Sequence, residues 1–327
     1  RDPQLGGKAR AGGGGVPVTR VGASAPGKAL LSGEYAVLEG APAIVAAVDR
    51  RVEVRWSDDD AAMPPEVVAT LERAQRRCGA IPGSLRIDAS RLRRGHVKLG
   101  LGSSAAAAVA TAGAVFATRG EDLRDPAVVQ RIFECALDGH AAVAPQGSGV
   151  DVAASAFGGF LRFVRDDEDV QAEPCSAPPN LVIHLVWTGH AARTSELVAG
   201  IRELETRDPR RFGTSMNLLK DLASEFADVF EAADAESVVR VAGAYSEAMA
   251  SLGDAAGVPI VEERLRTAHA LAARFSGSAK PCGAGGGDVA IAFFTNDEAA
   301  GAFELACGRE GLHPIRVCWG ARGVETL

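Results

Sequence analysis

Apolar residues occur along the chain in short runs that are separated by glycine and proline, a pattern typical of β-strands. Each run has the length of a strand and is far shorter than the roughly 20 residues of a membrane span. The runs predict strands at residues 18–24, 42–48, 51–56, 84–90, 159–164, 180–189, 288–294 and 313–319.

Other segments carry apolar residues at helical spacing, with start and stop signals at their ends. Residues 64–79 begin with two prolines and end at Cys-Gly, and residues 103–120 begin with serine and end at glycine. Further helices are predicted at 125–143, from 148 onward, four times within 193–275, and at 297–311. Because the helices cluster late instead of alternating regularly with strands, the pattern predicts an α+β fold.

Composition and charge narrow the possible partners. The 327 residues suffice for two domains or for one large domain with a sizeable core. The formal net charge is −7, and no basic stripe with interleaved aromatic residues occurs, so we expect no nucleic-acid partner. A small anionic substrate remains compatible with this charge, because a local cationic pocket needs only a few residues. We expect no membrane span.

The cysteines and the N-terminal segment bear on the compartment. None of the 6 cysteines has CxxC spacing, which argues against a zinc site or a disulfide framework and favours reduced thiols in a cytoplasmic protein. Residues 1–16 lack an initial methionine and the apolar core of a signal peptide. We predict that they form a flexible leader.

Three glycine-rich stretches carry the candidate chemistry, and the first is APGKALLSGEY at residues 25–35. It places Lys28 between a Pro-Gly turn and a short apolar run. A buried lysine is costly unless an anion meets its charge. The stretch therefore predicts an anionic partner for Lys28.

The second stretch is KLGLGSSAAAA at residues 98–108. Gly100 and Gly102 free the backbone, Ser103 and Ser104 supply hydroxyl groups, and an alanine-rich helix follows at once. A helix N-terminus fronted by bare N–H groups is a favourable site for phosphate oxygens. The alternative is an ordinary helix that is capped by serine after a glycine turn.

The third stretch is SAKPCGAGGGDVAIAFF at residues 278–294, in which a glycine-rich loop runs directly into a predicted strand. Such a loop is able to fold over a ligand, and Lys280 just before it is another possible partner for an anion. The alternative is a flexible linker.

In this order and spacing, the three stretches resemble the three motifs of the GHMP kinase superfamily, which includes galactokinase, homoserine kinase, mevalonate kinase and phosphomevalonate kinase. The resemblance extends over residues 18–320. It implies a two-domain α+β fold, with an N-terminal α+β domain of ribosomal-protein-S5-like type at 17–178 and a C-terminal ferredoxin-like α+β domain at 179–327. It also implies that ATP lies in the cleft between them, with its phosphates under the GLGSS loop.

Several local patterns look more like phosphomevalonate kinases than mevalonate kinases. They are Gly-Glu-Tyr at 33–35 where mevalonate kinases typically have Gly-Glu-His, Lys98 directly before LGLGSS, QGSGVDVAASAFGG at 146–159, VWTGHAARTSELV at 186–198, and Asp288 after GAGGG. The resemblance implies ATP-dependent phosphorylation of 5-phosphomevalonate to 5-diphosphomevalonate, in the mevalonate pathway of isoprenoid biosynthesis. The first alternative is phosphorylation of mevalonate at its 5-hydroxyl. A catalytically silent binding protein is less favoured, because the lysine, the aspartate and the loop serines are all present.

The candidate catalytic residues are Lys28, Lys98 and Asp151. A phosphomonoester has a second pKa of about 6, so an acceptor phosphate is already largely deprotonated at neutral pH. The difficulty is then repulsion between two phosphate groups, and cations should matter more than a base. Lys28 would bridge the two groups. Asp151 matches the superfamily's catalytic aspartate and would fix Lys28 and magnesium, or the two residues form only a structural ion pair.

The resemblance also implies ligand contacts. ATP would be bound by Gly100, Leu101, Gly102, Ser103, Ser104 and Ala105, with Mg²⁺ held by Ser104. The candidate acceptor contacts are Tyr35, Ser148, Gly149, Arg193, Ser195, Gly283, Ala284 and Gly285. Arg193 would bind a phosphate or carboxylate with its two-pronged guanidinium, or it is a solvated residue at a helix start. The expected partners are small molecules, and the expected assembly is a monomer or a homodimer.

Overall fold

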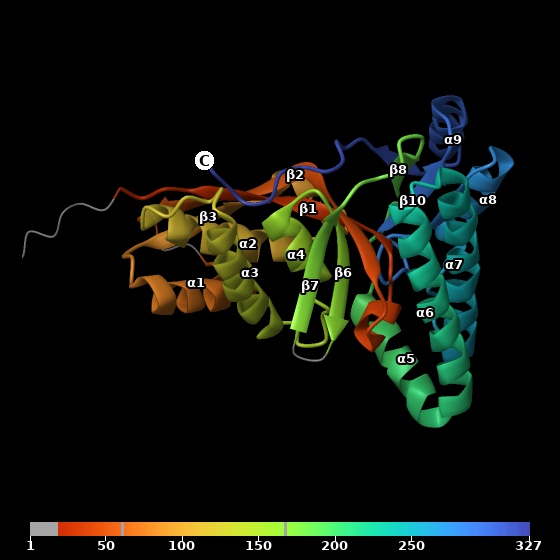
Figure 1. Ribbon diagram of the computed structural model, residues 1–327, viewed down its shortest axis with the longest axis horizontal. Coiled ribbons are helices and arrows are strands. Elements are labelled where there is room, and N and C mark those ends of the chain that lie inside the picture. Colours follow the sequence, from red (N-terminus) through yellow and green to blue (C-terminus); the bar gives the residue numbers. More distant parts are fainter. Residues whose placement is uncertain (1–18, 60–61, 167–168) are drawn as a thin grey trace, which may run out of the picture.

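The computed structural model describes residues 19–59, 62–166 and 169–327, and it confirms the α+β prediction. Two antiparallel sheets with separate sets of helices make up the two halves of the molecule (Figure 1). The predicted leader, residues 1–16, lies outside the described residues.

The first sheet has the strand order β12-β1-β2-β6-β7, and β3 also pairs with β2. Helices α2 and α4 pack against β1 and β2, while α1 and α3 pack against α2. The strands are β1 (Ala23–Ser32), β2 (Ala43–Ser57), β3 (Ser84–Asp88), β6 (Phe160–Asp166), β7 (Asp169–Cys175) and β12 (Glu325–Thr326). The helices are α1 (Pro65–Cys78), α2 (Ser103–Thr118), α3 (Pro126–Ala141) and α4 (Val150–Phe157).

The second sheet has the strand order β11-β8-β10-β9. Numbered within this half, the order is 4-1-3-2, with helices between its first and second strands and between its third and fourth. This is the ferredoxin-like arrangement that was predicted. The strands are β8 (Val182–Trp187), β9 (Ser278–Pro281), β10 (Val289–Phe294) and β11 (His313–Ile315). The helices are α5 (Thr194–Arg207), α6 (Pro209–Glu231), α7 (Ala235–Ala256), α8 (Glu263–Arg274) and α9 (Asp297–Arg309).

Short elements connect these parts. Two 3₁₀ helices, η1 (Ala36–Glu39) and η2 (Ser90–Leu92), follow β1 and β3. A small hairpin of β4 (Arg93–Arg94) and β5 (Val97–Lys98) leads into the GLGSS loop before α2.

Strands β1 and β2 differ from the prediction. The Pro-Gly pair that we expected to form a turn lies inside β1, at a shift of register between Pro26 and Gly27. A bulge accommodates a proline because the N–H that it lacks is not needed there. The runs at 42–48 and 51–56 are parts of one continuous strand, β2. The residues between the predicted runs do interrupt the regular pattern, but they mark irregular places within a strand and not the ends of strands.

The C-terminal part of each half also shows differences. Strands β7 and β9 were not predicted, and the last predicted strand ends at Ile315 instead of residue 319. The chain passes from the first sheet to the second between Cys175 and Val182, so the boundary at 178/179 stays a prediction. Within the predicted 179–327 domain, Trp319, Arg322 and β12 return to pair with the first sheet or the loop after α4.

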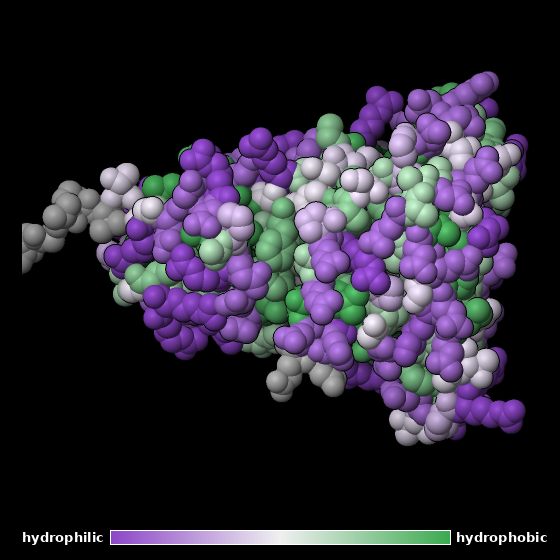
Figure 2. Space-filling view, in the orientation of Figure 1, coloured by the Kyte–Doolittle hydropathy of each residue, from purple (hydrophilic) through white to green (hydrophobic). Residues whose placement is uncertain are grey.

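The alanine-rich helix α2 lies at the centre of the first half. Every residue from Ala105 to Thr118 is buried. Small side chains let the sheet and the neighbouring helices approach closely, which fixes where the N-terminus of α2 points. On the face shown in Figure 2, hydrophilic residues cover much of the outer surface. No helix in the described part of the chain has the length and apolar character needed to cross a bilayer.

Candidate active site

Among the residues that the structure describes, no side chain caps the N-terminus of α2. Its N-cap residue is Gly102, in the left-handed conformation with φ 74° and ψ 31°, and no side chain accepts a hydrogen bond from the first turn. The alternative of a serine-capped helix is therefore wrong, because Ser103 and Ser104 are the first two helical residues. Both serines are half-buried. The unpaired N–H groups of this turn form a favourable site for an anion.

Lys28 lies against this turn. Its backbone N–H donates to Leu101 O at 3.0 Å, and its side chain is only 9% exposed. If residue 102 carried a Cβ atom, that atom would lie 2.9 Å from Lys28 Cγ. A Cβ on Gly27 would likewise lie 2.7 Å from Leu101 O. The glycines at 27 and 102 thus allow the strand and the loop to meet, and Lys28 runs across the start of α2.

Asp288 and Lys28 flank the same loop, because a Cβ atom on Gly100 would lie 2.8 Å from Asp288 Cβ and one on Gly102 would lie 2.9 Å from Lys28 Cγ. Burial raises the pKa of Asp288, while the hydrogen bond from Ala192 N and the charge of Lys28 act in the opposite direction. Asp151 lies in the first turn of α4, which packs against both β1 and α2, and its Oδ1 accepts from Val152 N at 3.0 Å. Lys28 and Asp151 form no ion pair within residues 19–59, 62–166 and 169–327, so their expected partnership stays a prediction.

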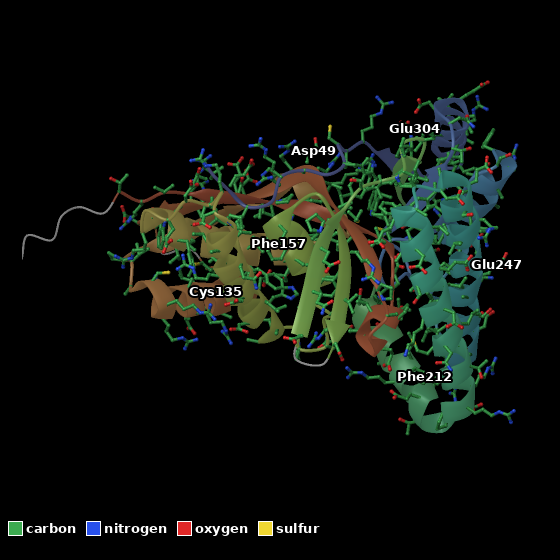
Figure 3. All side chains as sticks on the ribbon, viewed as in Figure 1. Asp49, Cys135, Phe157, Phe212, Glu247 and Glu304 are labelled. Atoms are coloured by element: carbon green, nitrogen blue, oxygen red, sulfur yellow. The ribbon has the colours of Figure 1, made fainter. Side chains whose placement is uncertain are left out.

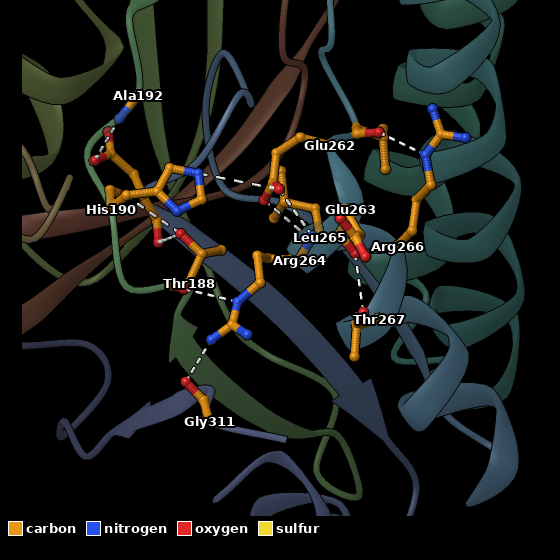
Figure 4. Close-up of polar contacts among 12 residues, drawn as sticks. Thr188, His190, Ala192, Glu262, Glu263, Arg264, Leu265, Arg266, Thr267 and Gly311 are labelled. Atoms are coloured by element: carbon orange, nitrogen blue, oxygen red, sulfur yellow. Dashed lines mark hydrogen bonds and ion pairs between the residues drawn. The ribbon is translucent and has the colours of Figure 1, made fainter.

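Asp288 also organises the segment 188–192, which follows β8. Its backbone N–H donates to His190 O at 2.9 Å, and its carbonyl oxygen accepts from Thr188 N at 2.9 Å. Its Oδ1 accepts from Ala192 N at 3.1 Å. Figure 4 shows the other side of this segment, where Arg264 Nε donates to Thr188 O at 3.1 Å. The segment is therefore held from two directions.

A second buried cluster joins the end of β1 to β9. Lys280 forms an ion pair with Glu34, whose Oε1 also accepts from Gly283 N at 3.3 Å. Tyr245 donates to Glu34 O at 2.8 Å, and its ring lies 5.5 Å from Lys280 Nζ. Lys280, which we suggested as a partner for a ligand anion, is thus already paired with a protein carboxylate.

The glycine-rich loop 282–288 connects β9 to β10 and is firmly held. Tyr35 donates its hydroxyl hydrogen to Ala284 O, and Gly286 N donates to Ile260 O at 2.8 Å. A Cβ on Gly285 would lie 2.2 Å from Ile260 O, so only glycine fits there. Burial, and secondarily the charge of Glu34, raise the pKa of Tyr35. Tyr35, Gly283 and Ala284 therefore meet at one place, as their common expected role requires.

Two cavities flank this region. One of about 850 Å³ is lined by Lys98 and Ser103 together with apolar residues that include Leu85, Ile87 and Ala107. The other, of about 660 Å³, lies between η1, the loop before α4, and helices α5 and α6. Its lining includes Tyr35, Gly147, Arg165, Arg202 and Phe212, the last of which is labelled on α6 in Figure 3.

The remaining predicted acceptor residues lie in two places. Ser148 and Gly149 precede α4, where Gly149 is the N-cap with φ 87° and Ser148 Oγ accepts from Val150 N at 3.4 Å. Arg193 is exposed over 80% of its side chain and pairs with Glu196 at 3.1 Å, and Ser195 is also exposed. The structure thus brings the first pair near Asp151, while Arg193 and Ser195 face solvent.

Comparison with known proteins gives the family. The profile described as "GHMP kinases N terminal domain" matches residues 66–159. The phosphomevalonate kinase of Streptomyces sp. (strain CL190) is 30% identical, over 93% of this chain and 95% of that protein. The chain belongs to the GHMP kinase family.

Two further comparisons concern a mevalonate kinase of similar sequence identity and a solved phosphomevalonate kinase structure of lower identity. The mevalonate kinase of Methanothermobacter thermautotrophicus is also 30% identical, over 83% of this chain and 89% of that protein. A structure of Streptococcus pneumoniae phosphomevalonate kinase in complex with phosphomevalonate and AMPPNP superposes with a TM-score of 0.75 at 20% identity, covering 93% of this chain and 99% of that one. The likeness to this structure supports the two-domain fold alone.

Sequence reasoning missed three residues that organise the site: Glu34, Arg165 and the side chain of Asp288. Glu34 gave a usable signal, because a carboxylate placed three residues after the apolar run ALL at 29–31 requires a buried partner. Arg165 Nη1 donates to Gly147 O at 2.8 Å and to Ser148 O at 3.2 Å. No local pattern in the sequence indicates that contact.

Proposed function

We propose that this GHMP kinase transfers the γ-phosphoryl group of ATP to the phosphate of 5-phosphomevalonate, giving 5-diphosphomevalonate. The observation that carries the proposal is the contact of the buried Lys28 with the uncapped N-terminus of α2. An anion-binding turn and a cation without a paired carboxylate within 4.0 Å, among the residues described, are what a phosphoryl group requires.

The ATP site follows from the cavity beside this turn. The 850 Å³ cavity is lined by apolar side chains suited to the purine ring of ATP and also by Lys98 and Ser103, which adjoin the turn. We assign the purine ring to this cavity and the phosphates to the backbone N–H groups of residues 100–105. Leu101 and Ala105 have buried side chains, so they would contribute only backbone groups.

The residues present are compatible with Mg²⁺. The described residues contain no group of three or more His, Cys, Asp or Glu side chains that could hold a metal ion. Mg²⁺ is commonly bound by one or two protein oxygens together with substrate phosphates, and Ser104 and Asp151 would supply such oxygens. The ion would neutralise charge on the bridged phosphates.

Lys28 would then neutralise the charge that develops as the two phosphate groups approach in line. Its backbone bonds to Leu101 O and its side chain packs against Gly102, so the position of its ammonium is restricted before the substrates bind. Such preorganised charge lowers the barrier without reorganisation during the reaction. Because an acceptor phosphate is largely ionised at neutral pH, no residue needs to remove a proton from it.

The acceptor would occupy the 660 Å³ cavity and the adjoining space near Tyr35 and Ser148. Arg165 and Arg202 in the lining are suited to a carboxylate at the end of the acceptor that does not react. The exposed Arg193 is a weaker candidate for this role. The identity with the Streptomyces phosphomevalonate kinase supports the choice of acceptor.

A second candidate is phosphorylation of mevalonate, which the identity with the Methanothermobacter mevalonate kinase supports. ADP release from Mg-ATP, measured with 5-phosphomevalonate, mevalonate, diphosphomevalonate, homoserine and galactose, separates the candidates. We expect turnover with 5-phosphomevalonate at a kcat/KM at least tenfold above that for mevalonate. The reverse order would replace the proposal with the mevalonate kinase reaction.

A further inference from the structure

We propose that Asp288 is a positioning residue for this phosphoryl transfer, which fixes segment 188–192 and presents a carboxylate to Lys28. The inference rests on the proposed function for its kinetic consequences. Its structural basis is the contact of Asp288 with two separate segments, 188–192 and the loop at Gly100, and the packing of Lys28 against that same loop.

The first contact is with the segment after β8. The backbone of Asp288 bonds to Thr188 and His190, and its side chain accepts from Ala192 N at 3.1 Å. Segment 188–192 leads directly into α5, which lines the 660 Å³ cavity through Val198 and Ile201. A shift of this segment would therefore move one wall of the proposed acceptor site.

The second contact is with the GLGSS loop, to which we assign the phosphates of ATP. If Gly100 carried a Cβ atom, that atom would lie 2.8 Å from Asp288 Cβ and 3.1 Å from Asp288 Oδ2. Gly100 has φ 74°, and Asp288 itself has φ 54°. Aspartate is one of the few residues that tolerate this left-handed conformation. Both residues thus adopt an unusual backbone where the two loops touch.

The third relationship is electrostatic. Gly102 lies against the Lys28 side chain as Gly100 lies against Asp288, so the two side chains flank one loop. Lys28 is almost fully buried and forms no ion pair in the described part of the chain, and its charge favours the ionised form of the Asp288 carboxylate. A carboxylate beside a desolvated ammonium partly offsets its burial and restricts its position. The same carboxylate repels phosphate, so it should lower the affinity for ATP while it aligns Lys28.

Three substitutions separate these roles. Asp288→Asn retains an oxygen for Ala192 N but removes the charge, so kcat should fall about tenfold while the KM for ATP stays unchanged or decreases. Ala192→Pro removes the N–H donor but retains the charge, so the acceptor KM should rise severalfold with kcat unchanged. Asp288→Ala removes both features and should show both effects. A folding defect would instead lower the fraction of active protein, without separating an effect on kcat from an effect on the acceptor KM.

The matched control is Asp49→Asn. The Asp49 carboxylate, labelled in Figure 3, also accepts a backbone N–H, from Cys318 at 2.9 Å. Asp49 lines neither of the two cavities, so the kinetic constants of this variant should equal those of the wild type. If Asp288→Asn leaves kcat at the wild-type value, or raises the KM for ATP, the charge role is wrong. If Ala192→Pro leaves the acceptor KM unchanged, the role in fixing segment 188–192 is wrong.

Failure of the proposed function would look different. The kinetics are measured with whichever acceptor the wild type phosphorylates, so a lack of turnover with 5-phosphomevalonate contradicts only the choice of acceptor. Amide hydrogen exchange of residues 188–192 gives a readout that does not need turnover. Exchange should be faster in Asp288→Ala than in the wild type and in Asp288→Asn. Equal exchange in all three proteins would overturn the inference.

Discussion

Glu34 and Lys280 form an ion pair between the end of β1 in the first sheet and β9 in the second. Their side chains are 1% and 0% exposed, and Lys280 Nζ also donates to Pro281 O at 2.9 Å. The pair therefore links the two halves of the molecule at the base of the glycine-rich loop. An ion pair removed from water in this way is costly to break on one side only.

We predict that Glu34→Gln and Lys280→Met each lower the free energy of unfolding by about 3–5 kcal/mol, because each leaves the partner's polar group buried and unmatched. The double variant should recover much of this loss, because both charges are then absent. Urea denaturation of the four proteins measures the coupling. Arg124→Met, at an exposed ion pair with Asp122, serves as the control and should show no measurable change. Additive losses in the double variant would contradict the prediction.

Gly102→Ala should impair activity more than stability. The substitution costs roughly 1 kcal/mol through the left-handed backbone, and its Cβ atom would also press on the Lys28 side chain 2.9 Å away. We expect kcat/KM to fall by about tenfold or more in the ADP-release assay.

The control is Gly120→Ala, just beyond the opposite end of α2. Gly120 also has a positive φ, of 83°, but a Cβ atom there meets nothing within 4 Å, and Gly120 lines neither cavity. It should share the backbone cost and retain the activity. Equal losses of activity in both variants would mean that the contact with Lys28 is unimportant.

Arg165→Ala should weaken the acceptor site. The Arg165 guanidinium holds the carbonyl groups of Gly147 and Ser148, directly before the helix that carries Asp151. We expect the acceptor KM to rise about tenfold and kcat to fall, with partial recovery in Arg165→Lys, whose ammonium keeps the charge but lacks the planar guanidinium that donates from Nη1 to both carbonyl groups. Arg162→Ala on the same strand, where the side chain lies 3.8 Å from Glu231, should leave both constants unchanged. A wild-type acceptor KM in Arg165→Ala would refute the assignment.

Elements with a strong local pattern could be predicted from the sequence. The four helices between residues 193 and 275 have regular apolar spacing and end signals, and α2 follows two glycines. The pattern that predicts phosphate binding by the GLGSS loop is also local, since its glycines, serines and helix are adjacent in the chain. Strand β7 was missed because it lacks an apolar run and pairs only with β6.

Long-range partners could not be predicted. Glu34 and Lys280 are 246 positions apart, and the contact of Asp288 with Ala192 spans 96 positions. A local pattern indicates that a buried charge needs a partner but does not identify that partner. For this reason Lys280 was linked to a ligand anion instead of Glu34, and Asp288 was overlooked beside Lys28.

His184 gives a prediction for pH. It lies on β8 with its Nδ1 3.7 Å from Glu304 Oε2, and Glu304 is labelled in Figure 3. Burial lowers the pKa of His184 below its usual 6.5, although Glu304 acts in the opposite direction. The unfolded chain therefore binds a proton on this residue more readily than the folded protein does. The stabilising contribution is present above pH 6.5 and is lost as the pH falls through the folded-state pKa.

The wild type should accordingly lose stability relative to His184→Gln as the pH falls from 7 to 5. Urea denaturation of both proteins across this range measures the difference. His313 also has a lowered pKa, caused first by burial and then by Arg94 and Arg264, but it is present in both proteins and cancels in the comparison. A difference that stays constant with pH, or that grows in favour of the wild type, would show that His184 is protonated at least as readily in the folded protein as in the unfolded chain.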